Sequence, residues 1–256
     1  MIMKISIIGL GNIGGMLAKR FAEILSPSNI MVFDTHKVKN GMYSRVSSSQ
    51  EVIDKSEVIF VCIRPQNLNK FFAEIKPKNK IFVSTVAAIY EKTYYEHLGK
   101  IKLVRIIPSM INKVGGPILL FSGKYASRYD KNRVKNLLSK IGNIYEVKEN
   151  EIDAFTHLSS CSPAIVAEFL KLYIETLASE KKINQKTALK ILIEMLEIIV
   201  PLLKKEGFKI IPQVCTKGGI TEQGIKIMNN YQDSFFKDLT GSLLKRMGEV
   251  RKQYGK

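Results

Sequence analysis

Residues 4–14, KISIIGLGNIG, place three glycines in the spacing GxGxxG directly after a short apolar run. The apolar run is typical of a buried strand, and apolar residues from Ile13 to Ile24 then recur at helical spacing. A strand, a glycine-rich turn and a helix in this order form the phosphate-binding unit of dinucleotide-binding folds. Gly9 allows the tight turn, Gly11 lets the backbone approach a pyrophosphate, and Gly14 permits close contact between helix and strand. We therefore expect dinucleotide phosphates at the N-terminus of this helix, held by Gly9, Gly11, Asn12, Ile13 and Gly14.

Asp34 follows the next predicted strand, Ile30–Phe33, and lies 20 residues after Gly14. An acid at this place binds the adenosine ribose of NAD. Thr35, His36 and Lys37 come directly afterwards, and a lysine there attracts the 2′-phosphate of NADP. We expect these four residues to contact the cofactor, which the sequence leaves open between NADH and NADPH.

Predicted strands and helices alternate through the first half of the chain. The strands are Lys4–Gly9, Ile30–Phe33, Val58–Cys62, Lys80–Ser84, Ile101–Ile107, Ile118–Phe121 and Ile144–Val147, and further helices are expected near residues 68–75, 90–97 and 130–141. This order predicts an α/β fold, a Rossmann-type doubly wound parallel sheet.

After Glu149 strand patterns give way to helices. Ser162-Pro163 is typical of an N-cap followed by the first helical residue, and that helix is expected to reach about Glu180. Asn184 is expected to cap a helix that ends near Lys205, and a loop over residues 207–219 leads to a helical region over residues 222–253. We predict a dinucleotide-binding domain at residues 1–149 and an all-helical dimerisation and substrate domain at residues 150–256.

The segment Gln185–Lys205 is apolar nearly all round, with only a narrow polar stripe. Such a helix needs cover on several sides, and four helices supply little of it. We expect a homodimer, with a higher oligomer of dimers left open. The alternative is a helix buried within its own bundle.

The net charge of +17 invites a nucleic-acid interpretation, but its distribution argues otherwise. Residues 1–148 carry 24 Lys and Arg against 10 Asp and Glu, scattered without a dense basic run. We expect a solvated surface that mildly steers anions, with no nucleic-acid and no membrane partner. Three widely spaced cysteines indicate neither a disulfide framework nor a metal site. With no room for a signal peptide before the first strand, we expect a cytoplasmic protein.

Residues 216–222, TKGGITE, form a glycine-rich turn into a helix. Backbone N–H groups at such a start bind a carboxylate, and Lys217 adds positive charge, so an anionic substrate fits. The alternative is a plain loop in which Thr221 is the N-cap. His97 and His157 have no paired acid at a telling spacing, and we expect structural roles for both.

Five segments in order resemble the pyrroline-5-carboxylate reductase family across the whole chain. They are VCIRPQ at 61–66, VSTVAAI at 83–89, VRIIPS at 104–109, LSSCSPA at 158–164 and TKGGIT at 216–221. The resemblance implies NAD(P)H-dependent reduction of pyrroline-5-carboxylate to proline by hydride transfer to a cyclic imine carbon. It adds Cys62, Arg64, Pro65 and Ala87 to the cofactor site and assigns Ser109, Thr216, Lys217, Gly218, Gly219, Ile220 and Thr221 to the substrate. It also makes Thr221 the catalytic residue at the ring nitrogen.

Several residues depart from the family pattern. Ser109 stands for Asn, Ser160 and Ser162 for two glycines, and Lys217 for proline. These departures bring the chain nearest a divergent branch of the family, the late-competence operon proteins. A related imino- or oxo-acid reductase and a non-catalytic regulatory dimer that keeps the dinucleotide site stay open as alternatives.

Overall fold

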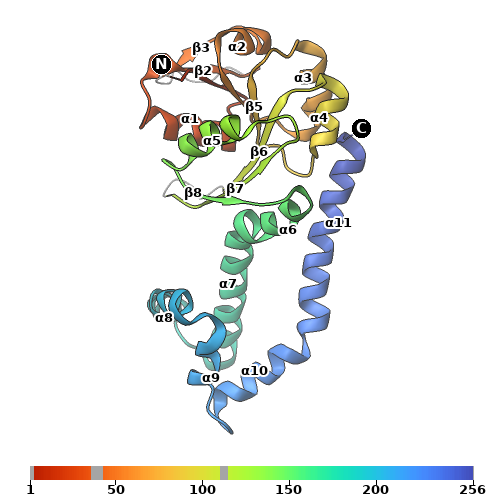
Figure 1. The fold of residues 1–256 in the computed structure, drawn as a ribbon. Helices are drawn as coiled ribbons and strands as arrows, with labels where there is room; N and C mark the ends of the chain where they lie inside the picture. Colours follow the sequence, from red (N-terminus) through yellow and green to blue (C-terminus); the bar gives the residue numbers. More distant parts are fainter. Residues whose placement is uncertain (1–2, 36–42, 110–114, 256) are drawn as a thin grey trace. The chain divides into compact units, whose positions relative to one another are not determined.

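The computed structural model describes residues 3–35, 43–109 and 115–255. Its first part alternates strands and helices (Figure 1). The strands are β1 (Ile5–Ile8), β2 (Ile30–Phe33), β3 (Ser44–Arg45), β4 (Val58–Val61), β5 (Ile81–Ser84), β6 (Lys102–Pro108), β7 (Pro117–Ser122) and β8 (Asn143–Glu146). The helices are α1 (Asn12–Ala22), η1 (Pro27–Asn29), α2 (Ser49–Lys55), η2 (Pro65–Asn67), α3 (Leu68–Glu74), α4 (Glu91–Leu98) and α5 (Arg128–Leu138).

Within the described residues these strands form one sheet in the order β3-β2-β1-β4-β5-β6-β7-β8. Neighbouring strands are parallel except β6 and β7, which are antiparallel. The predicted Rossmann-type doubly wound parallel sheet is therefore confirmed, with one reversal of direction between β6 and β7. The reason is the short connection between Pro108 and Pro117, since a parallel crossover needs a dozen or more residues.

Helices cover both faces of the sheet, as a doubly wound fold requires. On one face α1 and α5 bury Leu17, Phe21, Val134 and Leu138 against alternate strand residues such as Ile7 and Phe60. On the other face α2, α3 and α4 bury Ile53, Phe72 and Tyr94 against Ile8 and Ile59. The strand β3 and the helix α2 are absent from the sequence prediction. Ser48 caps α2 by accepting a hydrogen bond from the Glu51 N–H, a pattern that the sequence does carry.

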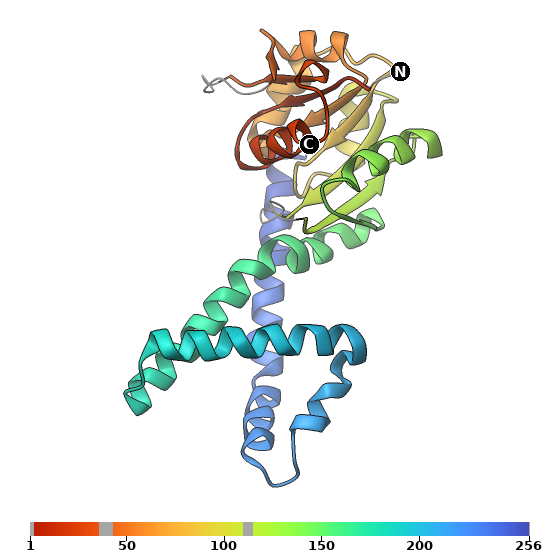
Figure 2. The ribbon, with the colours of Figure 1, turned by 90° about the vertical axis from the view of Figure 1, so that its left-hand side faces the viewer.

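The second part of the chain is helical. It contains η4 (Glu149–Glu151), α6 (Ile152–Thr156), η5 (His157–Cys161), α7 (Ser162–Lys181), α8 (Gln185–Glu206), η6 (Gly207–Lys209), α9 (Ile210–Val214), α10 (Ile220–Asn230), η7 (Gln232–Phe236) and α11 (Lys237–Tyr254). The segment α8 turns back from the end of α7 (Figure 2), and the predicted Asn184 cap of α8 is confirmed. Within the described residues, no helix is both long and apolar enough to cross a membrane.

Three predictions in this part are wrong in detail. Ser162 is not an N-cap, because α6 continues through the π-helical turn η5 into α7. Pro163 cannot donate a backbone hydrogen bond, and the chain changes from π to α winding directly before it. The expected loop over 207–219 contains η6 and α9, and the following helix begins at Ile220 rather than Glu222.

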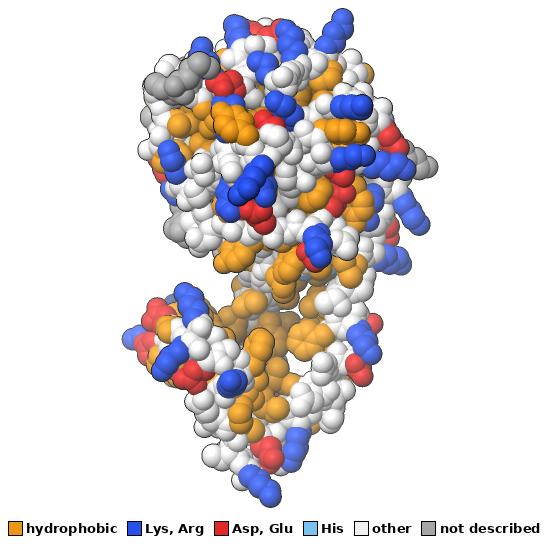
Figure 3. Space-filling view, viewed as in Figure 1, with side chains coloured by type: hydrophobic (Ala, Val, Ile, Leu, Met, Phe, Trp, Pro, Cys, Tyr) orange, Lys and Arg blue, Asp and Glu red, His pale blue; other side chains and the backbone are white. Residues whose placement is uncertain are grey.

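The chain forms two compact units, residues 1–161 with 243–256 and residues 162–242. The first unit thus includes α6 and the C-terminal end of α11, because both pack on the sheet domain. The predicted division at residue 149 follows the change of secondary structure instead. Lys and Arg side chains are scattered over the first unit, and apolar side chains gather over the helices of the second (Figure 3). No residue of α8 is buried in the single chain.

Candidate functional site

The glycine loop between β1 and α1 uses its three glycines in three different ways. Gly9 has φ +90°, and a Cβ there would lie 2.6 Å from the Cys62 carbonyl oxygen. A Cβ on Gly14 would lie 1.8 Å from the Gly9 carbonyl oxygen, so α1 starts in direct contact with the end of β1. A Cβ on Gly11 would meet nothing within 4 Å. Gly9 and Gly14 therefore shape the loop, while Gly11 leaves open space beside the backbone.

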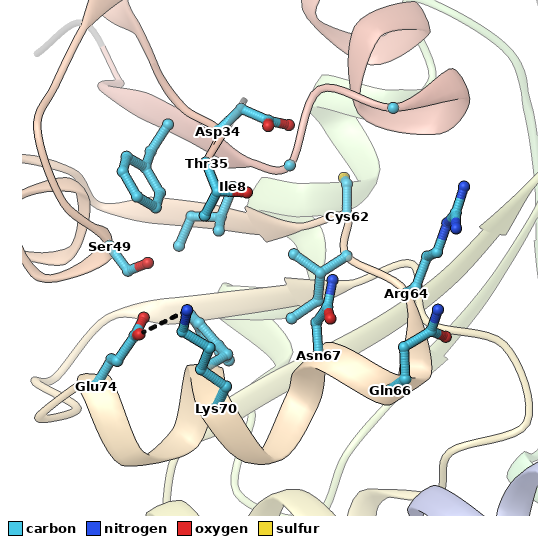
Figure 4. A pocket seen from close by; sticks show the side chains of 15 residues that line it. Ile8, Asp34, Thr35, Ser49, Cys62, Arg64, Gln66, Asn67, Lys70 and Glu74 are labelled. Carbon is cyan, nitrogen blue, oxygen red and sulfur yellow. Dashed lines mark ion pairs between the residues drawn. The ribbon is translucent and has the colours of Figure 1, made fainter. Parts of the chain in front are cut away.

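This open space belongs to a cavity of about 520 Å³ (Figure 4). It lies outside the carboxyl ends of β1, β2 and β4, where the strand order changes direction about β1. Dinucleotides bind at such a switch point in open α/β sheets. The α1 N-terminus, capped by Gly11 without a side-chain hydrogen bond, supplies N–H donors at the same place.

Asp34 joins the loop to the end of β2. Its carboxylate accepts the Leu10 backbone N–H at 2.5 Å, and it lines the cavity together with Thr35. His36 and Lys37, which we predicted as neighbours of the adenosine ribose, lie outside the described residues.

The structure brings only part of the predicted cofactor set to the cavity. Gly9, Gly11, Asp34, Thr35, Cys62 and Arg64 line it. Asn12 and Ile13 form the first turn of α1, Gly14 is packed against Gly9, Pro65 begins η2, and Ala87 follows β5, and none of these is among the lining residues.

Sequence reasoning missed the polar residues on the α3 side of the cavity. Gln66, Asn67, Lys70 and Glu74 line it there, and Ser49 lines it from α2. Lys70 and Glu74 form an ion pair of 3.7 Å across one turn of α3. Their i,i+4 spacing was visible in the sequence, but it indicates an exposed helix face and not a site.

Cys62 lies at the end of β4 and lines the cavity. Burial raises the pKa of its thiol to about 12, more than a hydrogen bond with Thr85 lowers it. The thiol is therefore neutral at physiological pH and suits a packing role rather than a nucleophilic one. All three cysteines are free. Within the described residues, no group of three or more His, Cys, Asp or Glu residues is placed to hold a metal ion.

In the second unit the loop before α10 is held by its own hydrogen bonds. The Gly219 N–H donates to the Thr216 carbonyl at 2.9 Å, and the Gly218 N–H donates to the Glu222 carboxylate at 2.9 Å. A Cβ on Gly219 would lie 2.5 Å from the Thr216 hydroxyl and 3.0 Å from the Thr216 carbonyl oxygen, so a larger residue would require this turn to shift. The N-cap is Gly219, and Thr221 is the second residue of α10, not its cap. Thr221, Lys217 and Ile220 are exposed in the single chain.

Ser109 directly follows β6 and is 1% exposed. Its N–H donates to the Pro117 carbonyl at 3.3 Å, whereas its hydroxyl has no hydrogen-bond partner in the described part of the chain.

The residues present fit a dinucleotide. A pyrophosphate requires a close backbone approach and free N–H donors, and the Gly11 space at the α1 N-terminus offers both. The fold and this loop define an oxidoreductase of the Rossmann class: residues 4–88 match the family described as NADP oxidoreductase, coenzyme F420-dependent.

Comparison over the full length narrows the class. Residues 149–247 match the family described as pyrroline-5-carboxylate reductase dimerisation. The chain is 26% identical to pyrroline-5-carboxylate reductase of Aquifex aeolicus, covering 98% of this chain and 97% of the relative. It is 25% identical to ComE operon protein 4 of Bacillus subtilis, covering 98% and 99%. Over nearly its whole length the chain is thus similar to proteins of the pyrroline-5-carboxylate reductase family.

Solved structures agree with this fold. The pyrroline carboxylate reductase of Plasmodium falciparum, solved with NADP bound, superposes with a TM-score of 0.83 at 23% identity. The superposition covers 99% of this chain and 98% of that one. At this identity the likeness concerns the fold.

Proposed function

We propose that this chain reduces pyrroline-5-carboxylate to proline with NADH or NADPH. The observation that carries the proposal is the glycine loop, in which Gly9 and Gly14 are sterically required and Gly11 is open to the cavity. Full-length relatives named pyrroline-5-carboxylate reductase support the reaction. The three free cysteines favour a reducing compartment, and we place the reaction in the cytoplasm.

The cofactor residues follow from the cavity. Gly11 and the first N–H groups of α1 hold the pyrophosphate, and Asp34 and Thr35 lie toward the adenosine ribose. When bound, the dihydronicotinamide supplies a hydride to the imine carbon, and the cofactor leaves oxidised. In this proposal the loops at this edge of the sheet are supported by four residues that do not line the cavity, Asn12, Ile13, Pro65 and Ala87.

The substrate residues come from the loop before α10. The N–H groups of Ile220 and Thr221 begin a helix that has no side-chain cap, and Lys217 is an exposed cation in the same turn. These groups suit the substrate carboxylate. We assign Thr216, Gly218 and Gly219 to shaping this loop and Ser109 to the substrate side of the sheet domain.

Thr221 is the proposed catalytic residue. The ring nitrogen of the imine must gain a proton as the carbon gains the hydride, and water supplies that proton. A hydroxyl orients or relays a proton better than it supplies one at its own pKa, so Thr221 acts by position.

We further propose a homodimer built on the second unit. No residue of α8 is buried in the single chain, although Ile191, Met195 and Ile198 are 52–57% exposed. Apolar surface of this extent on a helix requires a covering partner. The family description of residues 149–247 supports a second copy as that partner.

The experiment is steady-state reduction of pyrroline-5-carboxylate, followed by absorbance of the reduced cofactor. We expect Thr221→Ala to lower kcat on the order of 10²-fold or somewhat less, with unchanged dinucleotide affinity. Lys217→Ala should mainly raise KM, since it contacts substrate and transition state alike. Thr240→Ala is the matched control, because within the described residues the Thr240 hydroxyl donates to the carbonyls of Phe236 and Lys237, one turn earlier in the chain.

The same assay separates the proposal from the two alternatives that the sequence left open. If the wild-type protein binds the dinucleotide but reduces a different imino or oxo acid, that acid would take the place of pyrroline-5-carboxylate as the proposed substrate. Binding without turnover of any small imine would favour a regulatory dimer. An active wild type with an unimpaired Thr221→Ala variant would refute the placement of the chemistry.

A further inference from the structure

The C-terminal end of α11 returns to the sheet domain and contacts the loop after β5 (Figure 1). Arg251 Nε donates to the Ala88 carbonyl at 3.0 Å, and Arg251 Nη2 forms an ion pair with Asp153. Its guanidinium carbon lies 3.8 Å from the centroid of the Tyr90 ring. One side chain therefore binds both ends of the segment Ala88–Tyr90, which precedes α4.

That segment holds an unusual backbone. Ala88 has φ +64°, a left-handed conformation that disfavours any residue with a Cβ. A conformation that the residue itself resists needs outside contacts to keep it. The hydrogen bond from Arg251 fixes the orientation of the Ala88 carbonyl.

The same turn faces the cofactor edge of the sheet. The Thr85 N–H donates to the Val61 carbonyl at 3.0 Å, so the loop after β5 begins beside the loop after β4. Asp34 and β2 lie on the adenosine side of β1, and β4 and β5 lie on the opposite side. A dinucleotide that crosses the switch point extends its nicotinamide toward this second side. Ala87 is exposed there, while Val86 and Ala88 are buried.

A second charged pair completes the support. Arg105, 1% exposed on β6, donates to Glu149 at 2.7 Å, and the same carboxylate accepts the Glu91 N–H at 2.7 Å. The Arg105 guanidinium lies 5.7 Å from the centroid of the Tyr90 ring, and the Arg251 guanidinium lies 3.8 Å from it, so two arginines contact this ring. The two cations and two carboxylates balance in charge.

We infer that Arg251 is a positioning residue of the active site. From the end of α11 it holds the loop Thr85–Tyr90 in the shape against which the nicotinamide rests. It touches neither substrate nor cofactor. Its loss should disturb the alignment of the nicotinamide and leave the pyrophosphate contacts in place, because those belong to the loop Gly9–Gly14.

The test compares Arg251→Met with Arg246→Met. Arg246 lies on the same helix, is exposed and pairs only with Glu249 in the described structure, so it controls for the loss of an arginine. A double variant, Arg251→Met with Asp153→Asn, removes the carboxylate charge that the single variant would leave unpaired. Arg251→Lys keeps the charge without the planar fork.

We expect kcat to fall between 10- and 100-fold in Arg251→Met and in the double variant, since small misplacements cost this much. The dissociation constant for NADH should change less than about threefold, because one contact at a distance from the phosphates is lost. Arg251→Lys should recover part of the loss, and Arg246→Met should equal wild type. A double variant that stays folded with wild-type kcat would overturn the inference.

Because the role of the loop at the nicotinamide comes from the proposed function, a second readout avoids turnover. Hydrogen exchange of peptides covering residues 84–90 should accelerate at least tenfold in Arg251→Met without cofactor, and not in Arg246→Met. Fluorescence of bound NADH should change in the same variant. If wild type does not reduce pyrroline-5-carboxylate, these two measurements still decide whether Arg251 holds the loop. Unchanged exchange and unchanged fluorescence would refute the inference.

Discussion

A valine at Gly11 should separate cofactor binding from folding. Gly11 has φ −63°, which any residue adopts, and an added Cβ meets no atom within 4 Å. The free energy of unfolding should therefore stay within about 1 kcal/mol of wild type, since the position carries neither strain nor a clash. The added side chain instead occupies the space that a pyrophosphate needs.

The expected loss of affinity follows from the contacts at the α1 N-terminus. A hydrogen bond to a charged group contributes about 1.5–3 kcal/mol, so losing one raises the dissociation constant between about 10- and 150-fold. Titration of Gly11→Val with NADH and with NADPH measures this. Unchanged affinity for both would refute the assignment of the loop.

Gly14→Ala is the matched control from the same loop. Its Cβ would lie 1.8 Å from the Gly9 carbonyl oxygen, so α1 or β1 must move. Overpacking of this kind costs about 1–3 kcal/mol or more, which lowers Tm by several degrees in a chain of this size. Thermal unfolding without cofactor should thus be altered in Gly14→Ala and not in Gly11→Val. The reverse pattern would show that the three glycines have other roles.

Three further predictions follow from burial and backbone shape. Ala88→Val should lower the free energy of unfolding by about 2 kcal/mol, because a branched side chain resists φ +64°, whereas exposed Ala87→Val should stay within about 0.5 kcal/mol; denaturant unfolding measures both. With its pKa at about 12, Cys62 should react with iodoacetamide at pH 8 on the order of 10³ times more slowly in the folded than in the unfolded protein; equal rates would contradict the raised pKa. Ile198→Glu should break the dimer or cause aggregation in sedimentation, and Glu197→Gln should not; a wild-type monomer at micromolar concentration would end this proposal.

The sequence predicts the strands of the sheet domain because buried parallel strands are continuous apolar runs between turn residues. The run Ile30–Phe33 is a strand with the predicted ends. The strand β1 is one residue shorter than predicted at each end, and β4 and β5 are one residue shorter at one end. The strand β3 has two exposed polar residues, Ser44 and Arg45, and no apolar pattern marks it. The direction of β7 depends on the length of a connection, which periodicity does not report.

The candidate site also has residues that the sequence predicts and residues that it does not. The glycine loop was predictable because Gly9 and Gly14 occupy positions where a Cβ would clash, while Gly11 leaves the space that a pyrophosphate needs. The residues Gln66, Asn67 and Lys70 were not, because any exposed helix carries such side chains, and only the folded chain places them at the cavity. Arg251 was also out of reach, since its partners Ala88 and Asp153 are 163 and 98 residues away.

Two of the residues that depart from the family pattern have buried side chains. Ser109 and Ser160 stand where the family has Asn and Gly, and both hydroxyls are buried without a hydrogen-bond partner in the described residues. Ser159, which directly precedes Ser160, also has a buried hydroxyl without a hydrogen-bond partner in the described residues. Buried hydroxyls without partners are rare, because each costs about 1–3 kcal/mol. These hydroxyls without partners lie at or beside positions that depart from the family pattern, next to β6 and in the π-helical turn η5. The departures therefore change the polar groups inside this part of the sheet domain. A difference in substrate between this chain and the reductases should therefore originate there, while the glycine loop, which keeps the family pattern, preserves the cofactor.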